Sequence, residues 1–428
     1  MRPTVGAGAT AALAAAHFGG APAAAAAELI SYEDRNFLLT DAAGGRRILK
    51  VHNSGAAPAR LAAHSALMRH IAAAGVRCNV PLPALCGRDA VMVDLEGGQH
   101  ALRLLSYLPG AHYADAPPSP ALHASFGAFL ARLSAACATF DEPQALAALR
   151  IPHDWAMHVA AATIRRHAPL VAAFSAQQRA VVLEAADGCD AAVAEAEAAG
   201  GLAVQPVHGD ANELNVLVDE GGAPEARARA HAAAARGGPP CGASLIPAVA
   251  AAAVHPPGAA ACRDCVPPRR GGPAARCAPP PIGAEWAAAP PSRPPPPQQV
   301  VGVIDFGDCC VTWAATEVAV ALAYLLLLSP PPPPGAGLGG VDLAPAGRVL
   351  RAFLAARPLA AADLAVVPAL LRCRLALSVT MGAHSAALMP SNAAYVLTTQ
   401  AAGWALLGAL RGVDDGALLG ALLAAGGG

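Results

Sequence analysis

The sequence predicts an α+β protein of two lobes, with a small antiparallel sheet in the N-terminal lobe and a mainly helical C-terminal lobe. The chain has 428 residues, whereas a single compact domain seldom exceeds about 250–300 residues. Residues 1–107 contain short strand-like runs separated by glycine pairs, and residues 108–428 contain long runs of helix-forming residues. We therefore expect one lobe over 1–107 and the other over 108–428.

The composition excludes several classes of protein. The formal net charge is -1, from 29 basic and 30 acidic residues, so the chain lacks the basic surplus typical of nucleic-acid-binding proteins. No run of about 18 apolar residues free of charge is present, and we expect no membrane span. The eleven cysteines are odd in number and lack a disulfide-like spacing, which favours reduced thiols in a cytoplasmic protein. We expect a monomer.

The N-terminal segment allows two interpretations. Residues 1–27 are rich in alanine and carry one arginine and no acid, which is compatible with an organelle-targeting peptide. Such peptides are usually richer in arginine and serine. We favour an amphipathic helix over residues 8–18 and leave organelle targeting open.

Two β-hairpins and a helix are predicted in the N-terminal lobe. Residues 29–51 and 90–107 each contain two strand-like runs joined by a Gly-Gly turn. Between them, residues 59–74 place apolar side chains at helical spacing, and Gly75 ends that helix.

The C-terminal lobe is predicted to be helical with a few short strands. Residues 120–140 and 176–199 are helical in pattern, and the chain is again helical after residue 312. Residues 203–218 contain two short strand-like runs around a polar loop, and residues 300–304 form another strand.

A low-complexity insertion interrupts this lobe. Residues 221–299 are rich in proline and alanine and show no hydrophobic periodicity. Such a segment cannot bury enough apolar surface to offset its ordering entropy, so we expect it to be disordered. Cys262 and Cys265 have the spacing of half a zinc site, but no second close pair follows, and we interpret the pair as chance.

Two polar motifs carry the chemistry. The loop from His208 to Asn215 contains Asp210, and a strand end further on carries Asp305 and Asp308. Phosphoryl transfer needs an acceptor for the attacking hydroxyl's proton and oxygen ligands for Mg²⁺. Asp210 suits the first task, and the Asn215 amide and Asp305 carboxylate suit the second. His208 is the residue type that holds such a loop by hydrogen bonds.

The motif His-x-Asp-x-x-x-x-Asn, followed by Asp-Phe-Gly-Asp, resembles the catalytic and metal motifs of aminoglycoside phosphotransferases and related small-molecule kinases. These enzymes share a two-lobed protein-kinase-like fold. The resemblance implies that Asp210 is the catalytic base, that Asn215 and Asp305 bind Mg²⁺, and that Lys50 binds the nucleotide phosphates. Asp308 has a supporting position in the same motif.

Further segments are similar to the hydroxylysine kinases. Residues 31–37 resemble their nucleotide-covering loop, in which Ser31, Tyr32 and Asn36 would bind the nucleotide. The likeness continues through residues 103–110, 317–319, 381–384 and 403–404. It implies transfer of the γ-phosphate of GTP, or of ATP, to the hydroxyl of 5-hydroxy-L-lysine.

An amino-acid substrate carries charges of both signs. Asp308 and Glu317 are candidates to meet its amines, and Arg103 is a candidate to meet its carboxylate. A structural hydrogen bond or ion pair is an equally acceptable interpretation for each of the three. Asp34 is interpreted equally well as a residue that braces its loop.

One departure from the kinase pattern leaves alternatives open. Kinases of this fold usually pair the lysine with a glutamate on the first lobe's helix, and here Ala62 stands about where we expect it. Without that partner Lys50 loses a charge-assisted hydrogen bond. A kinase for another amino alcohol (choline, ethanolamine or homoserine) and a pseudokinase acting through protein contacts remain alternatives. A protein kinase is disfavoured, because no activation-segment pattern follows Asp305.

Overall fold

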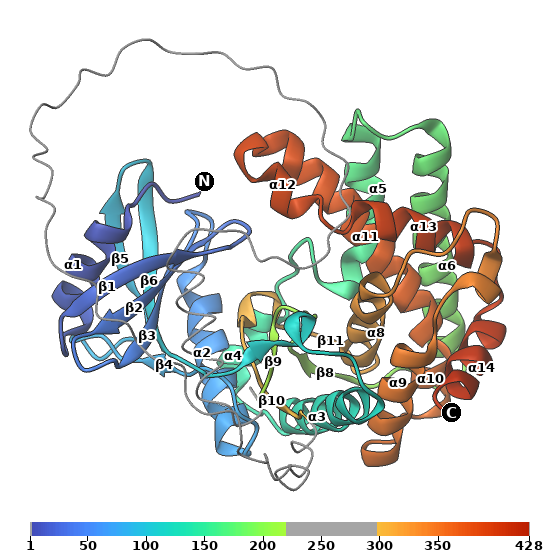
Figure 1. The fold of residues 1–428 in the computed structure, drawn as a ribbon, viewed down its shortest axis with the longest axis horizontal. Helices are drawn as coiled ribbons and strands as arrows, with labels where there is room; N and C mark the ends of the chain where they lie inside the picture. Colours follow the sequence, from blue (N-terminus) through green and yellow to red (C-terminus); the bar gives the residue numbers. More distant parts are fainter. Residues whose placement is uncertain (1, 220–297, 428) are drawn as a thin grey trace, which may run out of the picture. The chain divides into compact units, whose positions relative to one another are not determined.

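The computed structural model describes residues 2–219 and 298–427 (Figure 1). The insertion predicted over 221–299, with Cys262 and Cys265, lies outside the described residues except for Gln298 and Gln299.

The N-terminal part of the chain forms one antiparallel sheet with two helices, as predicted. The strands lie in the order β1-β2-β3-β6-β4, and β5 also pairs with β6. The elements are α1 (Ala7–Phe18), β1 (Ala23–Leu29), β2 (Arg35–Asp41), β3 (Arg46–Val51), α2 (Pro58–Ala73), β4 (Pro81–Leu82), β5 (Val91–Leu95) and β6 (Gly98–Ser106). The β2–β3 and β5–β6 pairs are the two predicted hairpins, and α1 is the predicted N-terminal helix.

The two faces of this sheet differ because side chains alternate along a strand. Phe37 and Leu49 point to one face and are fully buried in a core shared with α1. On the opposite face Lys50 pairs in register with Asn36 of β2 and Arg103 of β6. Asn36, Lys50 and Arg103 therefore lie side by side on one face of the sheet, in its middle strands.

Strand β1 was not predicted. It covers an alanine-rich run, and alanine is a poor strand former. Its backbone pairs with β2, with Ala27 opposite Leu38 and Leu29 opposite Asn36. Pairing with an existing strand therefore overrides the local preference.

The C-terminal part is helical around a large core. Its helices are α3 (Pro120–Ala138), α4 (Pro143–Leu149), α5 (Ala160–His167), α6 (Ala176–Ala198), α8 (Thr316–Leu328), α9 (Ala344–Ala356), α10 (Ala361–Ala365), α11 (Val367–Leu388), α12 (Ala393–Val396), α13 (Gln400–Leu410) and α14 (Asp415–Ala425). Helix α11 contacts α5, α6, α8 and α13 and forms the centre of this lobe (Figure 1).

Helix α3 alone, among the described helices, is long and apolar enough to cross a membrane by length and composition. However, 61% of that apolar stretch is buried inside the protein, as expected for a core helix. The bent pair formed by residues 390–396 and 400–410 meets the same test only when both parts are counted together.

Two small antiparallel sheets bring the two polar motifs together. The 208–215 loop joins β8 (Val204–Val207) to β9 (Val216–Val218), and Asp305 lies between β10 (Val300–Val303) and β11 (Cys310–Trp313). Strand β9 pairs with β10 and with β7 (Ala111–His112), while β8 pairs with β11. Because the strands before and after each motif are paired, the loops between them must meet.

Candidate active site

His208 holds the 208–215 loop from inside. Its side chain is buried, with Nε2 3.1 Å from the carbonyl oxygen of Ile304. The backbone N–H of Asp210 donates to its Nδ1 at 3.3 Å. Burial lowers the pKa of His208 to about 4, so the imidazole is neutral and its Nε2–H donates to Ile304. The side chain thus ties the Asp210 loop to the strand that ends at Asp305.

Glu317 braces the same loop, which is the structural hydrogen bond that the sequence left open beside a contact with a substrate amine. It lies at the start of α8 with no exposed surface, and its Oε2 accepts the backbone N–H of His208 at 2.7 Å. Burial raises the pKa of Glu317 to about 7. This carboxyl group has no access to a substrate.

Gly209 follows His208 with a φ of 78°, and a Cβ there would lie 2.9 Å from the carbonyl oxygen of Asp308. Both the left-handed conformation and the close approach therefore require glycine. This contact places the two polar motifs against each other. Asp308 also accepts a hydrogen bond from His153 Nε2 on its backbone oxygen at 3.2 Å.

Both carboxylate oxygens of Asp210 are engaged by the protein. Oδ2 accepts the side-chain amides of Asn212 at 3.0 Å and Asn215 at 2.8 Å. Oδ1 accepts Nη2 of Arg374 at 2.7 Å. Burial raises the pKa of Asp210 well above its ordinary value, Arg374 lowers it, and the nearby Asp308 raises it further. The side chain retains 19% exposure, so an acceptor group can reach it.

Arg374 was missed from the sequence. It lies on α11, its residue is 1% exposed, and its guanidinium lies 4.9 Å from the ring centre of Trp155 and 5.4 Å from that of Tyr324. One feature of the sequence could have identified it. Arg374 stands among apolar residues of a helix, and an arginine buried in such a place needs an anionic partner. Nothing local in the sequence indicates that Asp210 is this partner.

Asn215 and Asp305, the residues predicted to bind metal, each have a side-chain oxygen that could be a ligand. Asn215 uses Nδ2 to donate to Asp210, and no hydrogen bond within the described chain occupies its Oδ1. Asp305 has a left-handed φ of 61°, and its Oδ1 accepts the N–H of Gly307 at 3.3 Å. A non-glycine residue in this region is strained, and such strain is concentrated at functional sites.

These donors fit Mg²⁺, which prefers oxygen ligands and keeps several waters and phosphate oxygens. The described residues contain no group of three or more His, Cys, Asp or Glu side chains that could hold a metal. A metal held by one carboxylate oxygen and one amide oxygen would therefore need further ligands, which the phosphate oxygens of a nucleotide and water molecules could supply.

Lys50 projects from the sheet to Asp305. Its Nζ lies 2.6 Å from Asp305 Oδ1 and 3.7 Å from Asp34 Oδ2. Asn36, its neighbour across the strands, has an amide oxygen that is buried without a partner among the described residues. Ser31 donates its hydroxyl to the backbone oxygen of Asp34 at 2.5 Å.

Tyr32 points to the helical lobe. Its hydroxyl contacts Ser385 Oγ and lies 3.4 Å from the backbone oxygen of Met381, both on α11. Its ring meets that of Trp155 edge-on, with 5.9 Å between centroids. The amide of Asn392 donates to the backbone oxygen of Tyr32 at 3.1 Å. The loop predicted to cover the nucleotide is thus attached to α11.

The structure also decides the positions of Arg103 and Ala62. Of the two interpretations left open for Arg103, the structural hydrogen bond is the one observed, because the residue is 3% exposed and donates to Ser65 Oγ at 2.9 Å. Ala62 does not occupy the place facing Lys50, because it lies on the exposed side of α2.

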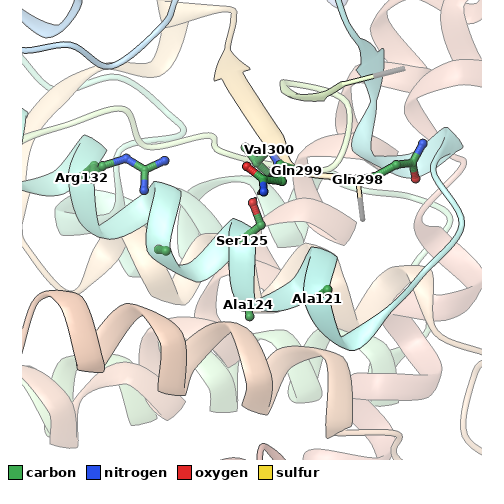
Figure 2. Close-up of a pocket in the computed structure, with 8 residues that line it drawn as sticks. Ala121, Ala124, Ser125, Arg132, Gln298, Gln299 and Val300 are labelled. Carbon is green, nitrogen blue, oxygen red and sulfur yellow. Dashed lines mark hydrogen bonds between the residues drawn. The ribbon is translucent and has the colours of Figure 1, made fainter. Parts of the chain in front are cut away.

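A separate pocket lies on the outer side of α3 (Figure 2). There Ser125 Oγ accepts the N–H of Val300 at 2.9 Å. The residues lining it are Ala121, Ala124, Ser125, Ala128, Arg132, Gln298, Gln299 and Val300. None belongs to the two polar motifs, and we assign it no part in the site.

Residues 27–226 match the model of the phosphotransferase enzyme family. An uncharacterized protein of Deinococcus radiodurans is 33% identical over 171 residues, which cover 40% of this chain and 46% of that protein. The chain thus spans about half the length of the curated relative it matches.

The fold is similar to those of several solved kinases. The microcompartment-associated aminopropanol kinase is 17% identical with a TM-score of 0.59, covering 94% of this chain and 98% of that one. Amicoumacin kinase in complex with AMP-PNP, Ca²⁺ and Ami is 15% identical, with a TM-score of 0.56 and 96% of each chain covered. Spectinomycin phosphotransferase with ADP and spectinomycin is 10% identical, with a TM-score of 0.53 and 98% of each chain covered.

These likenesses confirm the predicted protein-kinase-like fold, with its antiparallel N-terminal sheet and helical C-terminal lobe. The match of residues 27–226 to the phosphotransferase enzyme family agrees with the predicted enzyme class, a phosphotransferase.

Proposed function

We propose that the protein is a small-molecule kinase that transfers the γ-phosphoryl group of GTP or ATP to a hydroxyl group of an amine-bearing substrate. The observation that carries the proposal is the convergence of four side chains from distant parts of the chain. Asn215 donates to Asp210 at 2.8 Å, Lys50 lies 2.6 Å from Asp305, and the N–H of Ile304 donates to the backbone oxygen of Asn215 at 2.8 Å.

In this proposal Asp210 accepts a hydrogen bond from the acceptor's hydroxyl and takes its proton as the new phosphate ester bond forms. The bond between the γ-phosphorus and the bridging oxygen breaks at the same time, and the nucleoside diphosphate leaves. Asn212, Asn215 and Arg374 hold the carboxylate of Asp210 in place. Positioning of this kind is the main contribution of a protein to phosphoryl transfer.

In this proposal the nucleotide binds beside Asn215, Asp305 and Lys50. Asn215 and Asp305 would hold Mg²⁺, which neutralises charge on the phosphate oxygens. Lys50 would contact the phosphates, and Ser31, Tyr32 and Asn36 belong to the strand and loop that cover them. The unpartnered amide oxygen of Asn36 beside Lys50 supports a polar ligand at this point, because a buried polar atom without a partner is costly.

The narrow form of the proposal takes 5-hydroxy-L-lysine as acceptor, by resemblance to the hydroxylysine kinases. Its amines suit the acidic surroundings of Asp210, to which the half-buried Asp308 contributes. Its carboxylate is harder to place. Arg103 is buried elsewhere, and Arg374 is 1% exposed and already bonded to Asp210.

The lack of an available cation for the substrate's carboxylate favours another candidate, an amino alcohol without a carboxylate. The amines of choline and ethanolamine need acids and aromatic rings only. Trp155 and Tyr32 lie near Asp210's partner Arg374 and offer such rings. Homoserine, like hydroxylysine, would still need a cation for its carboxylate.

A phosphate-transfer assay on the full chain tests these proposals. GTP and ATP are each supplied with Mg²⁺ and 5-hydroxylysine, choline, ethanolamine or homoserine. Turnover with hydroxylysine alone supports the narrow form, and turnover with choline or ethanolamine supports the second candidate. Folded protein that binds nucleotide and turns over none of the four would instead support the pseudokinase alternative.

A further inference from the structure

Lys50 lies between two carboxylates. Its Nζ is 2.6 Å from Asp305 Oδ1 and 3.7 Å from Asp34 Oδ2. No other carboxylate of the described residues forms an ion pair with it. The Lys50 side chain is 10% exposed, so water cannot replace these partners. An ammonium group buried this deeply needs at least one of the two acids.

Helix α2 offers Lys50 no carboxylate, because it contains no Asp or Glu. The buried polar residues of α2 are His64 and Ser65. Ser65 accepts a hydrogen bond from Arg103, which is the neighbour of Lys50 across the strands. The α2 side of Lys50 therefore presents a second cation instead of an acid.

Asp305 cannot serve Lys50 in every state of the proposed enzyme. It is the carboxylate proposed to bind Mg²⁺, and its side chain is 41% exposed at the end of β10. A divalent cation competes with the ammonium group for the same oxygen atoms. Once Asp305 is engaged, Lys50 must have another anion that keeps it directed at the phosphates.

Asp34 has the rigidity that this task requires. Its Oδ1 accepts the backbone N–H of Asn53 at 2.9 Å and its side-chain amide at 3.1 Å. Its Oδ2, which faces Lys50, lies 2.9 Å from Nδ1 of His52. Burial raises the pKa of Asp34, but His52, Lys50 and Asn53 together hold it well below its ordinary value.

We propose that Asp34 is the positioning residue of Lys50 and replaces the helix carboxylate that α2 lacks. This inference rests on the proposed function. Asp34 lies in the loop that follows β1, and Ser31 of that loop donates to its backbone oxygen at 2.5 Å. The same loop that would cover the nucleotide therefore also holds the lysine that contacts its phosphates. The carboxylate that α2 lacks is thus supplied by the loop between β1 and β2.

If Asp34 positions Lys50, its loss has an effect that depends on Mg²⁺. If Asp34 only braced its loop, that effect would not depend on Mg²⁺. Without metal, Asp305 is available to Lys50, and loss of the Asp34 carboxylate matters little. With Mg²⁺ on Asp305, Asp34 is the remaining partner. The effect of Asp34→Asn on nucleotide binding must therefore depend on Mg²⁺.

The test measures the affinity of the full chain for ADP by calorimetry, with Mg²⁺ and with EDTA. We expect Asp34→Asn to weaken ADP binding about ten-fold with Mg²⁺ and less than two-fold with EDTA. Asp41→Asn is the matched control, because it removes a carboxylate of the same sheet, at the far end of β2, that accepts the backbone N–H groups of Ala43 and Gly45 in its own turn. It should change neither affinity by more than two-fold.

A double-mutant cycle adds a second, independent measurement. In a Lys50→Met background, Asp34→Asn should have no further effect on the affinity for ADP with Mg²⁺. An equal loss with Mg²⁺ and with EDTA, an equal loss in both backgrounds, or no loss at all would each overturn the role of Asp34. Wild-type protein that is folded but does not bind ADP at all would instead contradict the proposed function itself.

Discussion

The buried Arg374 and the half-buried Asp210 form an ion pair, with 2.7 Å between Nη2 and Oδ1, across 164 residues of sequence. The arginine comes from the central helix of the C-terminal lobe, and the aspartate comes from the loop between β8 and β9. Burial and the nearby Asp308 and Asp305 raise the pKa of Asp210, whereas Arg374 lowers it and holds the carboxylate in place. The pair connects the helical core of the lobe directly to the proposed chemistry.

We predict that Arg374→Lys lowers kcat by about 10- to 100-fold and leaves the KM for nucleotide within about three-fold. A lysine keeps the charge but not the planar geometry of the guanidinium, and Arg374 contacts Asp210 and not the nucleotide side. Arg372→Lys is the control, because Arg372 lies two residues earlier on the same helix and pairs with Asp415. Steady-state kinetics of both variants checks the prediction.

Arg374→Ala should be largely inactive and also less stable, because removing one partner of a buried pair costs about 3–5 kcal/mol. Added guanidine should restore part of the kcat if the missing group acts at Asp210. An unchanged kcat in Arg374→Lys, together with no rescue of Arg374→Ala, would show that the arginine only stabilises the fold.

We expect Asp210→Ala to abolish turnover, with a loss of about 10²–10⁴-fold in the rate of phosphoryl transfer. Its affinity for ADP with Mg²⁺ should stay within about three-fold, because Asp210 faces the acceptor. Single-turnover transfer and calorimetric ADP binding measure the two quantities on the same preparation. Retained turnover in a folded variant would refute the role of Asp210 as base.

For Asp305→Ala, the expected loss is the dependence of nucleotide binding on Mg²⁺. In the wild type, Mg²⁺ should tighten ADP binding, since the metal joins Asp305 and Asn215 to the phosphates. In the variant, the affinities with Mg²⁺ and with EDTA should agree within about two-fold. If Mg²⁺ still tightens binding to the wild-type extent, then Asp305 is not a metal ligand.

Glu317 gives a prediction of pH dependence. Its pKa is about 7 in the folded protein against an ordinary value of 4.5, because of burial. The folded state therefore binds the proton more tightly than the unfolded state. The stabilisation is fully present below about pH 4.5 and is lost as the pH rises to about 7, an effect on the order of 3 kcal/mol.

The measurement is the difference in the free energy of unfolding between the wild type and Glu317→Gln, from urea denaturation at pH 5, 6, 7 and 8. The glutamine does not titrate, so the difference isolates this one group. The wild type should lose stability relative to the variant most steeply between pH 5 and 7, with only a small further loss from pH 7 to 8, where the titration of Glu317 is nearly complete. A constant difference would mean that Glu317 has an ordinary pKa.

Much of the architecture could be predicted because it depends on neighbouring residues. The hairpin turns, the helix ended by Gly75, and the order of the two polar motifs are properties of short segments. Pairing of β8 with β11 and of β9 with β10 then brings Asp210, Asn215 and Asp305 together, as the motif order implied. Strand β1 escaped prediction, because its alanine run becomes a strand only by pairing with β2.

The sequence by itself determined the fold class and the identity of the motif residues, since both follow from local patterns and spacing. Only the tertiary structure decided their partners. It placed Arg374 on Asp210, turned Glu317 inward to the backbone of His208, and buried Arg103 under α2. It also set Asp34 beside Lys50 where α2 has no acid. Burial removes water from these groups, so each charge must find a partner in space, and that partner can come from any part of the chain.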